Sequence, residues 1–323
     1  MTTISAKVIA DSIGEHAPRL TTLLLRYPRR IHAEGRTHRV MRVCEDMEVE
    51  VLTPSLMEDP DLSRNASSSR AMPVEKLIKD VLDDPAIPLF WGKNQKGMQA
   101  GEECSNRVRT WDFGGKEGSS WDREGAWLFA RDNAIRMARA FSEAGYAKQI
   151  VNRLLEPFSH ITVLCSATQW SNFFALRRHE AAEPHIHMLA DAMWDAMQAS
   201  TPQLLDVGEW HLPFVNVTDE EGEPKVLRGN SPALTNAIKL SVARCASTSY
   251  RTVDGFEMTF LRAVELHDKL VSQAPLHASP CEHQATPNKP RPFQGKAVWL
   301  GDQGGNLGPY WIQYRKTLKN ECM

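Results

Sequence analysis

The chain has 323 residues, of which 42% are hydrophobic and 24% are charged, a composition typical of a globular protein with a sizeable core. A formal net charge of −2 excludes the broad basic field that draws proteins onto DNA, RNA or anionic lipid, so we expect any nucleotide it binds to be a small ligand and not a polymer. No apolar run reaches the roughly 20 residues of a membrane span, and no signal-peptide pattern opens the chain, so we expect a cytoplasmic protein that does not enter a membrane.

The first part of the chain is predicted to hold two strands and two helices around an acidic insertion. The strands cover residues 5–10 and 20–27, and a helix follows over 29–41. Residues 41–62 are acidic, contain two prolines and show no helical periodicity, so they are predicted to form a loop or small hairpin inserted into the fold. Pro73 can occupy the first turn of the next helix, whose buried stripe would be Val74, Leu77, Ile78 and Val81.

The middle of the chain begins with a polar segment. Residues 92–121 are rich in Gly, Ser, Asn, Lys and Glu, which predicts a flap or an excursion over the surface. Asp122 is predicted to cap a helix that ends at Gly145 and buries Ala126, Ala130, Ala134, Met137, Ala138 and Phe141. A short helix is expected over 147–155. Residues 161–167 are mostly apolar, and their periodicity leaves strand and buried helix equally open.

Three more helices are predicted in the second half. The first begins at Pro184 and buries one face formed by Ile186, Leu189, Ala190, Met193 and Met197. The second is capped by Ser231 and reaches Cys245, and the third covers 259–272. From residue 275 the chain is predicted to be mostly loop, with an aromatic segment at 310–315 that docks onto the rest. Because no repeat or linker is found, we predict a single mixed α/β (α+β) domain over residues 1–323.

Cysteine and histidine spacing gives no indication of a metal site. The six cysteines lie far apart without a C-x-x-C pair, which predicts reduced thiols in a cytoplasm. His185 and His187 are two positions apart and would point to different sides of a helix. His277, Cys281 and His283 could supply soft ligands, but no second pair stands at the spacing of a zinc site. We therefore predict no bound metal.

Two short runs near the insertion combine side chains that suit an anion. Thr37-His38-Arg39 and the run from Ser63 to Arg70 bring together imidazole, guanidinium, amide and hydroxyl groups. Arginine forks match phosphate oxygens two at a time, and serine hydroxyls add neutral donors. A cofactor or substrate that carries phosphate is the simplest interpretation. The alternative is a Ser-rich surface turn beside a charged helix.

Three further clusters of polar and titratable residues lie at 172–187, 243–250 and 276–284. Arg177 follows an apolar stretch, so its charge needs a ligand or a partner, and an Arg–Glu pair between two helices would serve equally well. The chain has no G-x-S-x-G elbow, no G-x-G-x-x-G that opens a helix after a strand, and no G-x-x-x-x-G-K-[ST]. The sequence therefore favours neither a serine hydrolase nor a Rossmann or P-loop protein.

Together the four clusters resemble the motifs of the flavin-dependent thymidylate synthases (the ThyX family). The family signature is R-H-R-x-x-S-x-N-E-x-S-x-R, and most of its fixed positions are matched here once the acidic insertion is set aside. Thr37 replaces the first Arg and Ala66 replaces the Glu. Residues 172–177 and 182–187 are similar to the family segments N-F-L-x-L-R and A-Q-x-E-I-R, with His185 and His187 in place of the Glu and the final Arg.

The order of the motifs differs from that of the common form. Residues 246–250 and 277–283 resemble the family runs A-R-V-S-Y and H-x-[ST]-P-F-E-H, which ordinary members carry first and this chain carries last. The chain is therefore predicted to be circularly permuted, an arrangement associated with distant, often phage-encoded relatives. Because the termini of compact domains often lie close together, such a permutation is physically tolerable.

The resemblance implies a ThyX-type fold in a homotetramer with active sites between subunits, in a cytoplasm that can be that of a phage-infected bacterium. It implies a methyltransferase of dTMP biosynthesis that moves a one-carbon unit from methylenetetrahydrofolate to C5 of dUMP, with FAD, reduced by NADPH, as the hydride source. The residues implied to bind FAD are His38, Arg39, Asn65, Arg177, Ser249, His277, Ser279 and Glu282. Those implied to bind dUMP are Ser67, Ser68, Arg70 and His187, of which Ser68 and Arg70 are also the implied catalytic residues.

The departures from the family motifs motivate two other hypotheses. The changes at Thr37, Ala66, His185 and His187 are compatible with a dUMP hydroxymethylase that serves modified phage DNA. The interrupted signature is compatible with a non-catalytic flavin- or nucleotide-binding relative. His187 also places a titratable ring where the family carries a permanent charge, so activity is expected to fall as the pH rises past about 6.5.

Overall fold

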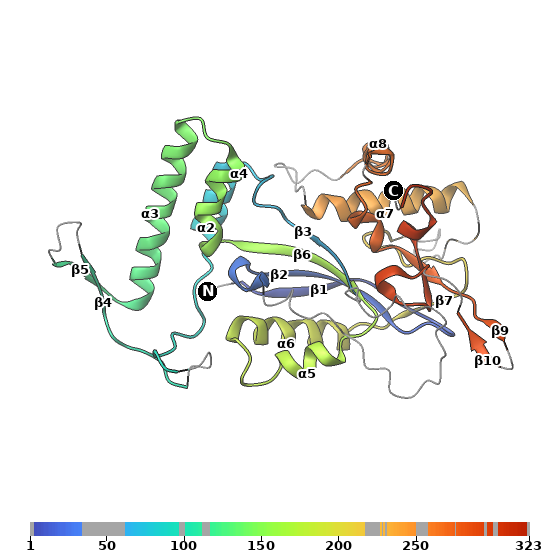
Figure 1. The fold of residues 1–323 in the computed structure, drawn as a ribbon, viewed down its shortest axis with the longest axis horizontal. Helices are drawn as coiled ribbons and strands as arrows, with labels where there is room; N and C mark the ends of the chain where they lie inside the picture. Colours follow the sequence, from blue (N-terminus) through green and yellow to red (C-terminus); the bar gives the residue numbers. More distant parts are fainter. Residues whose placement is uncertain are drawn as a thin grey trace.

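A computed structural model describes residues 3–33, 62–96, 101–111, 117–216, 227, 229, 231–249, 258–274, 276–293, 296–299 and 303–321. His38, Arg39 and the predicted insertion up to residue 61 lie outside the described residues, as do the side chains of Asn65 and Ser249. Figure 1 shows a central sheet with helices on both sides and a further group of helices at one end. The architecture is mixed α/β, as predicted.

The central sheet has five strands in the order β3-β6-β2-β1-β7. All neighbouring pairs are antiparallel except β1 with β7. β2 is rich in leucine and buried along nearly its whole length, as a strand covered on both faces requires. Both N-terminal strand predictions are confirmed, and residues 161–167 prove to be a strand. The strands are β1 Ser5–Gly14, β2 Leu20–Pro28, β3 Leu62–Ala66, β6 His160–Ala167 and β7 Gln203–Leu205.

One face of the sheet, here the α6 side, is covered by α5 (Ser171–Arg177) and α6 (Pro184–Gln198). The predicted stripe of α6 is buried as expected and packs with Phe173 and Phe174 of α5 against β2 and β6. Glu183 caps α6 by accepting hydrogen bonds from the backbone N–H groups of His185 and Ile186. This side is a continuous apolar core.

The opposite face, here the α7 side, is covered by two helices and by the C-terminal part of the chain. α7 (Pro232–Ser249) extends one turn beyond its predicted end, and α8 (Phe260–Ser272) matches its prediction. The C-terminal part was expected to be mostly loop, yet it forms short strands and 3-10 turns around Trp311, which is fully buried. These are η4 Ser279–Glu282, β8 Ala285–Pro287, β9 Arg291–Phe293, β10 Lys296–Val298, η5 Gly305–Leu307, β11 Trp311–Gln313 and η6 Tyr314–Thr317.

The helices at the end of the sheet form a helical lobe that packs around its own small core. Leu77, Ile78 and Val81 of α2 are buried as predicted, and the carboxylate of Asp122 accepts from the backbone N–H of Gly125 at 2.6 Å, which confirms the predicted cap. The lobe consists of α2 Val74–Asp83, α3 Arg123–Glu143, α4 Lys148–Val151 and η3 Asn152–Phe158, with the hairpin β4 Val108–Trp111 and β5 Glu117–Trp121 beside it.

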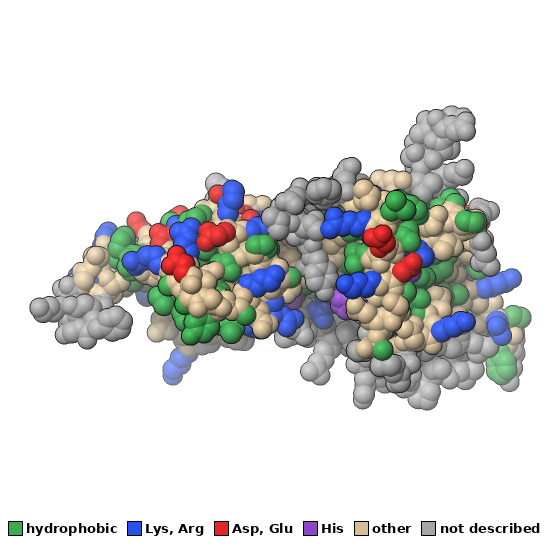
Figure 2. Space-filling model, turned by 90° about the horizontal axis from the view of Figure 1, so that it is seen from above, with side chains coloured by type: hydrophobic (Ala, Val, Ile, Leu, Met, Phe, Trp, Pro, Cys, Tyr) green, Lys and Arg blue, Asp and Glu red, His purple; other side chains and the backbone are tan. Residues whose placement is uncertain are grey.

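The predicted buried stripe of α3 is partly wrong. Met137 is 52% exposed and Ala130 is exposed, whereas Ile135 and Ala138 are buried. α3 contacts α2, α4 and η3 along one narrow side, and alanine is compatible with either a buried or an exposed face. Figure 2 shows basic and acidic side chains interspersed over this end of the molecule. Within the described residues, no helix has the length and apolar character to cross a membrane.

The predicted helix over 29–41 is seen only at its start. Residues Arg29–Ile31 form the 3-10 turn η1, and the rest of the prediction falls outside the described residues beyond residue 33.

Candidate functional site

Strand β3 carries the second half of the signature-like run and sends its side chains to both faces of the sheet. Ser63 pairs with Ser166 of β6, and Arg64 pairs with Cys165. Because successive side chains of a strand point to opposite faces, Ser63 faces the α7 side and Arg64 faces the α6 side. Their contacts agree, since Ser63 meets Asn306 of the C-terminal part and Arg64 lines a cavity under α6.

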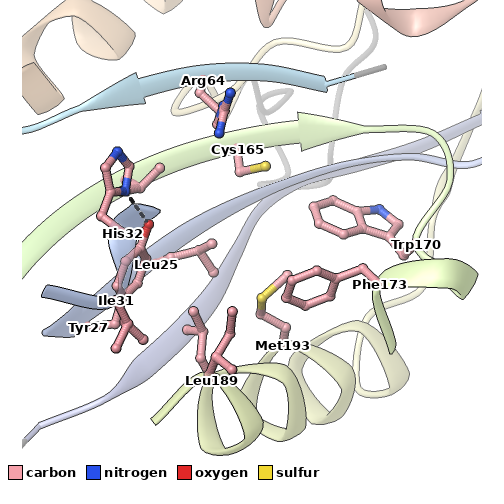
Figure 3. A pocket seen from close by; sticks show the side chains of 12 residues that line it. Leu25, Tyr27, Ile31, His32, Arg64, Cys165, Trp170, Phe173, Leu189 and Met193 are labelled. Carbon is pink, nitrogen blue, oxygen red and sulfur yellow. Dashed lines mark hydrogen bonds between the residues drawn. The ribbon is translucent and has the colours of Figure 1, made fainter. Parts of the chain in front are cut away.

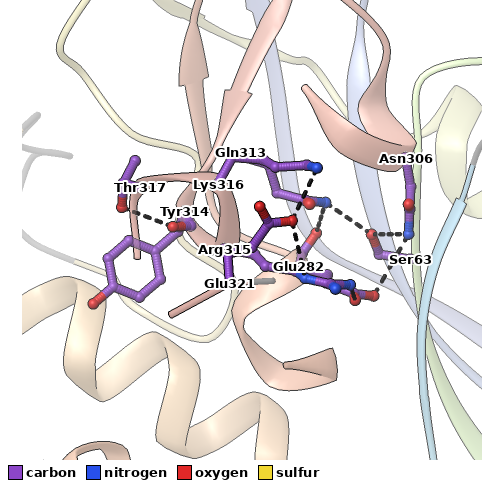
Figure 4. Close-up of polar contacts among 9 residues, drawn as sticks. All are labelled: Ser63, Glu282, Asn306, Gln313, Tyr314, Arg315, Lys316, Thr317 and Glu321. Atoms are coloured by element: carbon purple, nitrogen blue, oxygen red, sulfur yellow. Dashed lines mark hydrogen bonds and ion pairs between the residues drawn. The ribbon is translucent and has the colours of Figure 1, made fainter. Parts of the chain in front are cut away.

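On the α7 side, the first and fourth clusters meet through two amide side chains (Figure 4). The Asn306 amide donates to Ser63 Oγ at 3.3 Å and to Glu282 Oε2 at 3.5 Å. The Gln313 amide donates to Ser63 Oγ at 3.2 Å and to the Glu282 carbonyl at 2.8 Å. Two segments more than 200 residues apart in the sequence are therefore held side by side.

The carboxylate of Glu282 forms an ion pair with an arginine of the same chain. Its Oε1 lies 2.5 Å from Nη1 of Arg315, and the two side chains are 12% and 30% exposed. Burial raises the pKa of Glu282, and Arg315 opposes that rise. A carboxylate bound by a guanidinium and an amide is already satisfied, so its predicted role at a cofactor stays a prediction.

Below this contact, five buried hydroxyl and imidazole groups form a hydroxyl–imidazole chain across the sheet. Ser12 lies 2.9 Å from Nδ1 of His211, whose Nε2 lies 2.7 Å from Oγ1 of Thr22. Thr22 is 2.5 Å from Ser166, and Ser166 is 2.8 Å from Nδ1 of His283. Burial lowers the pKa of both imidazoles to about 3, so both rings are neutral at pH 7. The chain fixes β1, β2 and β6 to the loops that carry the two histidines.

The hydroxyl–imidazole chain was not predicted from the sequence. The available signal was the interruption of apolar strands by Thr22 and Ser166, and it gave no indication that His211 would lie between them. His283 Nε2 has no hydrogen-bond partner among the described residues.

The third cluster lies on the same side. The C-terminal turns of α7 pack against β3 and η4, and Cys245 is fully buried there, with the Gln284 amide 3.4 Å from its sulfur. Burial raises the pKa of this thiol, so it is not a nucleophile at neutral pH. His277 and Ser279 lie half-buried just before and at the start of η4. Three of the four clusters are therefore neighbours on the α7 side.

The second cluster lies on α5 and α6, which cover the face of the sheet opposite to α7. Arg177 ends α5 and lines an open groove of about 410 Å³. His187 contacts Asp191 one turn further along α6, at 3.3 Å. Within one chain, the structure does not bring Arg177 and Glu282 together.

His185, one of the departures from the family motif, has a clear role in the fold. It is 3% exposed, and its Nδ1 lies 2.5 Å from Glu183 Oε1. Its Nε2 lies 2.7 Å from a terminal nitrogen of Arg30 and 3.1 Å from the backbone N–H of Leu89. The ring therefore ties the start of α6 to η1 and to the segment that follows α2.

A cavity between the sheet and α6 has aromatic walls (Figure 3). Its volume is about 50 Å³, whereas an apolar cavity that accepts a benzene ring measures about 150 Å³. At the edge of the cavity, the hydroxyl of Tyr27 is hydrogen-bonded to Nδ1 of His32 at 2.8 Å. Burial raises the pKa of the Cys165 thiol, which also lines the cavity, to about 12. The cavity has room for water but not for a nucleobase or a flavin ring. The lining comes from β2, β3, β6, α5 and α6 and includes Leu25, Tyr27, Arg64, Cys165, Trp170 and Phe173.

The turn that follows β3, residues 67–72, is called the serine loop here, and five of its six carbonyl groups accept hydrogen bonds, four of them from outside the loop and all from described residues. Arg29 donates to the Ser67 carbonyl at 3.1 Å. Asn152 donates to the Ser69 carbonyl at 2.6 Å and to that of residue 72 at 2.8 Å. The Ser68 carbonyl accepts from the backbone N–H of Ala71 at 3.1 Å, and Lys148 donates to the Ala71 carbonyl at 3.0 Å.

Three backbone N–H groups of the serine loop, unlike most of its carbonyls, have no hydrogen-bond partner among the described residues. No described residue accepts a hydrogen bond from the backbone N–H groups of Ser68, Ser69 or Arg70. Ser68 is half-buried and Arg70 is exposed. Backbone N–H groups without internal acceptors can donate to a bound anion, and a guanidinium beside them adds a bidentate donor. The loop therefore presents donors and a positive charge.

The other hydroxyls of the loop are used by the fold. Ser67 Oγ accepts from the backbone N–H of Thr162 at 3.0 Å, and Ser69 Oγ donates to Glu156 at 2.5 Å. Of the loop residues predicted to bind dUMP, Ser67 is buried and its hydroxyl is used, whereas Ser68 is half-buried and Arg70 is exposed. In the part of the chain that the structure describes, no three His, Cys, Asp or Glu side chains gather as they would around a metal ion.

Comparisons with known proteins give only distant similarity. No protein family and no curated protein matches the sequence. Among solved structures, the chain is similar to the UMP/dUMP methylase PolB from Streptomyces cacaoi bound with 5-Br dUMP, with 14% identity over 61% of this chain and 90% of that chain and a TM-score of 0.40. The same enzyme bound with 5-Br UMP gives 14% identity over 61% and 89%, with a TM-score of 0.35.

Proposed function

We propose that this chain is an enzyme that modifies dUMP in the manner of the flavin-dependent thymidylate synthases, and that the serine loop binds the nucleotide phosphate. The observation that carries the proposal is the donor-rich edge formed by Ser68, Ser69 and Arg70. It occurs in the segment whose sequence resembles the dUMP-binding part of the family signature.

The chemistry of the loop suits a phosphate monoester. Such a dianion accepts several hydrogen bonds, and those made to charged groups are worth about 1.5–3 kcal/mol each. The backbone N–H groups supply fixed donors, Ser68 supplies a hydroxyl, and Arg70 supplies a guanidinium that can bind two oxygens. Glu156 lies nearby, but the half-buried Arg29 offsets its charge. The loop would hold the nucleotide by its phosphate and leave the pyrimidine to be oriented by other residues.

The meeting of β3, α7 and η4 on the α7 side supports the wider resemblance. Segments that resemble separate family motifs come together, although their order along the chain differs from that of the common form. The proposed reaction is the transfer of a one-carbon unit from methylenetetrahydrofolate to C5 of dUMP, with homotetramers as the proposed assembly.

The described members of the predicted FAD set do not form one site within a chain. Arg177 lies on the α6 side, whereas Glu282 lies on the α7 side and is bound by Arg315. FAD, reduced by NADPH, would supply the hydride of the reaction, and we propose that it binds between copies of the chain.

The test is release of tritium from dUMP labelled at C5, measured with FAD, NADPH and methylenetetrahydrofolate present. We expect release that depends on each addition. Binding of dUMP without release would identify the non-catalytic alternative, and a product with the mass of 5-hydroxymethyl-dUMP would identify the hydroxymethylase. A protein that neither binds dUMP nor releases tritium contradicts the proposal.

A further inference from the structure

The serine loop is held from one direction by side chains of the helical lobe and of η1. The geometry points to Asn152 of η3 as a positioning residue that aims the loop's N–H donors at the phosphate. This inference rests on the proposed function, and it adds a residue that no sequence motif indicated.

A single amide nitrogen holds two carbonyl groups of the serine loop. Asn152 is fully buried, and its Nδ2 donates to two carbonyls, those of Ser69 and Met72. Its Oδ1 has no partner among the described residues. Reversing the amide would place that oxygen against two carbonyl oxygens, so the two hydrogen bonds fix the orientation of the side chain.

Peptide geometry then determines the direction of the donors. In a trans peptide, the C=O of one residue and the N–H of the next point in opposite directions. The Ser69 carbonyl is directed at Asn152, so the N–H of Arg70 points away from the lobe. The Ser67 carbonyl is directed at Arg29, so the N–H of Ser68 points away from Arg29. The N–H groups of Ser68 and Arg70 are thus directed away from the two side chains that hold the loop, Arg29 and Asn152.

A second contact from η3 reinforces this arrangement. Glu156, one turn after Asn152, accepts a hydrogen bond from the Ser69 hydroxyl at 2.5 Å. Ser69 is 4% exposed, so this contact is protected from water. The position of the loop relative to η3 is therefore specified at both its backbone and its side chain.

The experiment uses the full chain with Asn152→Leu, which keeps the branched shape, removes the donors and adds no charge. The matched control is Asn288→Leu, because Asn288 also donates from Nδ2 to a backbone carbonyl, that of Pro309 at 2.8 Å, in the C-terminal part. Binding of dUMP and of inorganic phosphate is measured by calorimetry, together with thermal unfolding and the KM and kcat for dUMP.

We expect Asn152→Leu to weaken binding of both dUMP and phosphate by about tenfold. KM for dUMP should rise, whereas kcat should stay within about twofold of the wild-type value, because a residue that positions the phosphate-binding loop acts on binding and not on the base. Asn288→Leu should bind as the wild type does, even where its unfolding temperature falls by a similar amount.

Ser69→Ala serves if Asn152→Leu does not fold, because it removes only the hydroxyl that contacts Glu156. It should weaken dUMP binding by about two- to threefold. Wild-type affinity in the folded fraction of either variant overturns the inference and leaves the proposed function standing. A wild-type protein that binds neither dUMP nor phosphate overturns both.

Discussion

The two faces of the central sheet are held in different ways. On the α6 side, leucine, valine and aromatic side chains from β2, β6, α5 and α6 form one apolar cluster. On the α7 side, β2, β3 and β6 carry Thr22, Ser63 and Ser166, which are joined by hydrogen bonds to residues of loops and of the C-terminal part. One strand residue therefore contributes to an apolar core while its neighbour contributes to a polar network. The α6 side should therefore tolerate substitutions by apolar side chains of similar volume, whereas the α7 side depends on particular polar atoms.

The largest effect is expected on the α6 side. Leu23 is completely buried, so Leu23→Ala should lower the free energy of unfolding by about 3–4 kcal/mol. Urea denaturation measures the loss, and Leu176→Ala on the 52% exposed position of α5 should change it by about 0.5 kcal/mol or less. A loss below about 1 kcal/mol at Leu23 would show that this face is not a tightly packed core.

The second largest effect is expected on the α7 side, whose stability should fall at acid pH. The pKa of His211 and of His283 is about 3 in the folded chain, against about 6.5 in an unfolded one. Their contribution to stability is therefore complete above pH 6.5 and is lost as the pH falls from 6.5 toward 3. The two rings together should lower the free energy of unfolding by about 2 kcal/mol between pH 6.5 and 5.5.

Urea denaturation at a series of pH values checks this slope. His160, whose pKa burial lowers to about 4, acts in the same direction, so the comparison is made with His283→Gln, which should reduce the slope by the share of one ring. A wild-type stability that stays constant from pH 7 to pH 5 would contradict the neutral, buried assignment of these imidazoles.

A smaller effect is expected when the hydroxyl–imidazole chain is cut at its centre. Thr22→Val keeps the volume and removes the oxygen shared by Ser166 and His211, so it should cost about 1–2 kcal/mol. Thr162→Val, at a half-buried position of β6, is the control and should have little effect. Equal stability of the two variants would mean that the chain of hydrogen bonds does not stabilise the α7 side.

The elements that could be predicted from the sequence are those with local signals. The 3.6-residue stripe of α6, the Asp122 cap and the leucine-rich β2 each lie within one short segment. The stripe of α3 was partly wrong because a row of alanines does not reveal which side of a helix meets its neighbours. Residues 161–167 could not be assigned because a short apolar run fits a buried strand and a buried helix equally well.

The candidate site was predictable only where a motif marked it. Ser68 and Arg70 belong to the signature-like run, and no described residue accepts a hydrogen bond from their backbone N–H groups. Asn152 and His211 could not be predicted, because each acts on residues that are 80 or more positions away in the sequence. Such contacts depend on the tertiary fold, and no local pattern records them.

The central claim is that the serine loop binds the phosphate of dUMP, and calorimetric titration with dUMP and with deoxyuridine tests it most directly. We predict that the wild type binds dUMP more tightly than deoxyuridine. Arg70→Ala should reduce the affinity for dUMP by about ten- to a hundredfold and leave deoxyuridine unaffected. Arg136→Ala, which removes the same charge from an exposed position of α3, should change neither affinity. Equal affinities of the wild type for dUMP and deoxyuridine, or an Arg70→Ala variant that binds dUMP as the wild type does, would contradict this account.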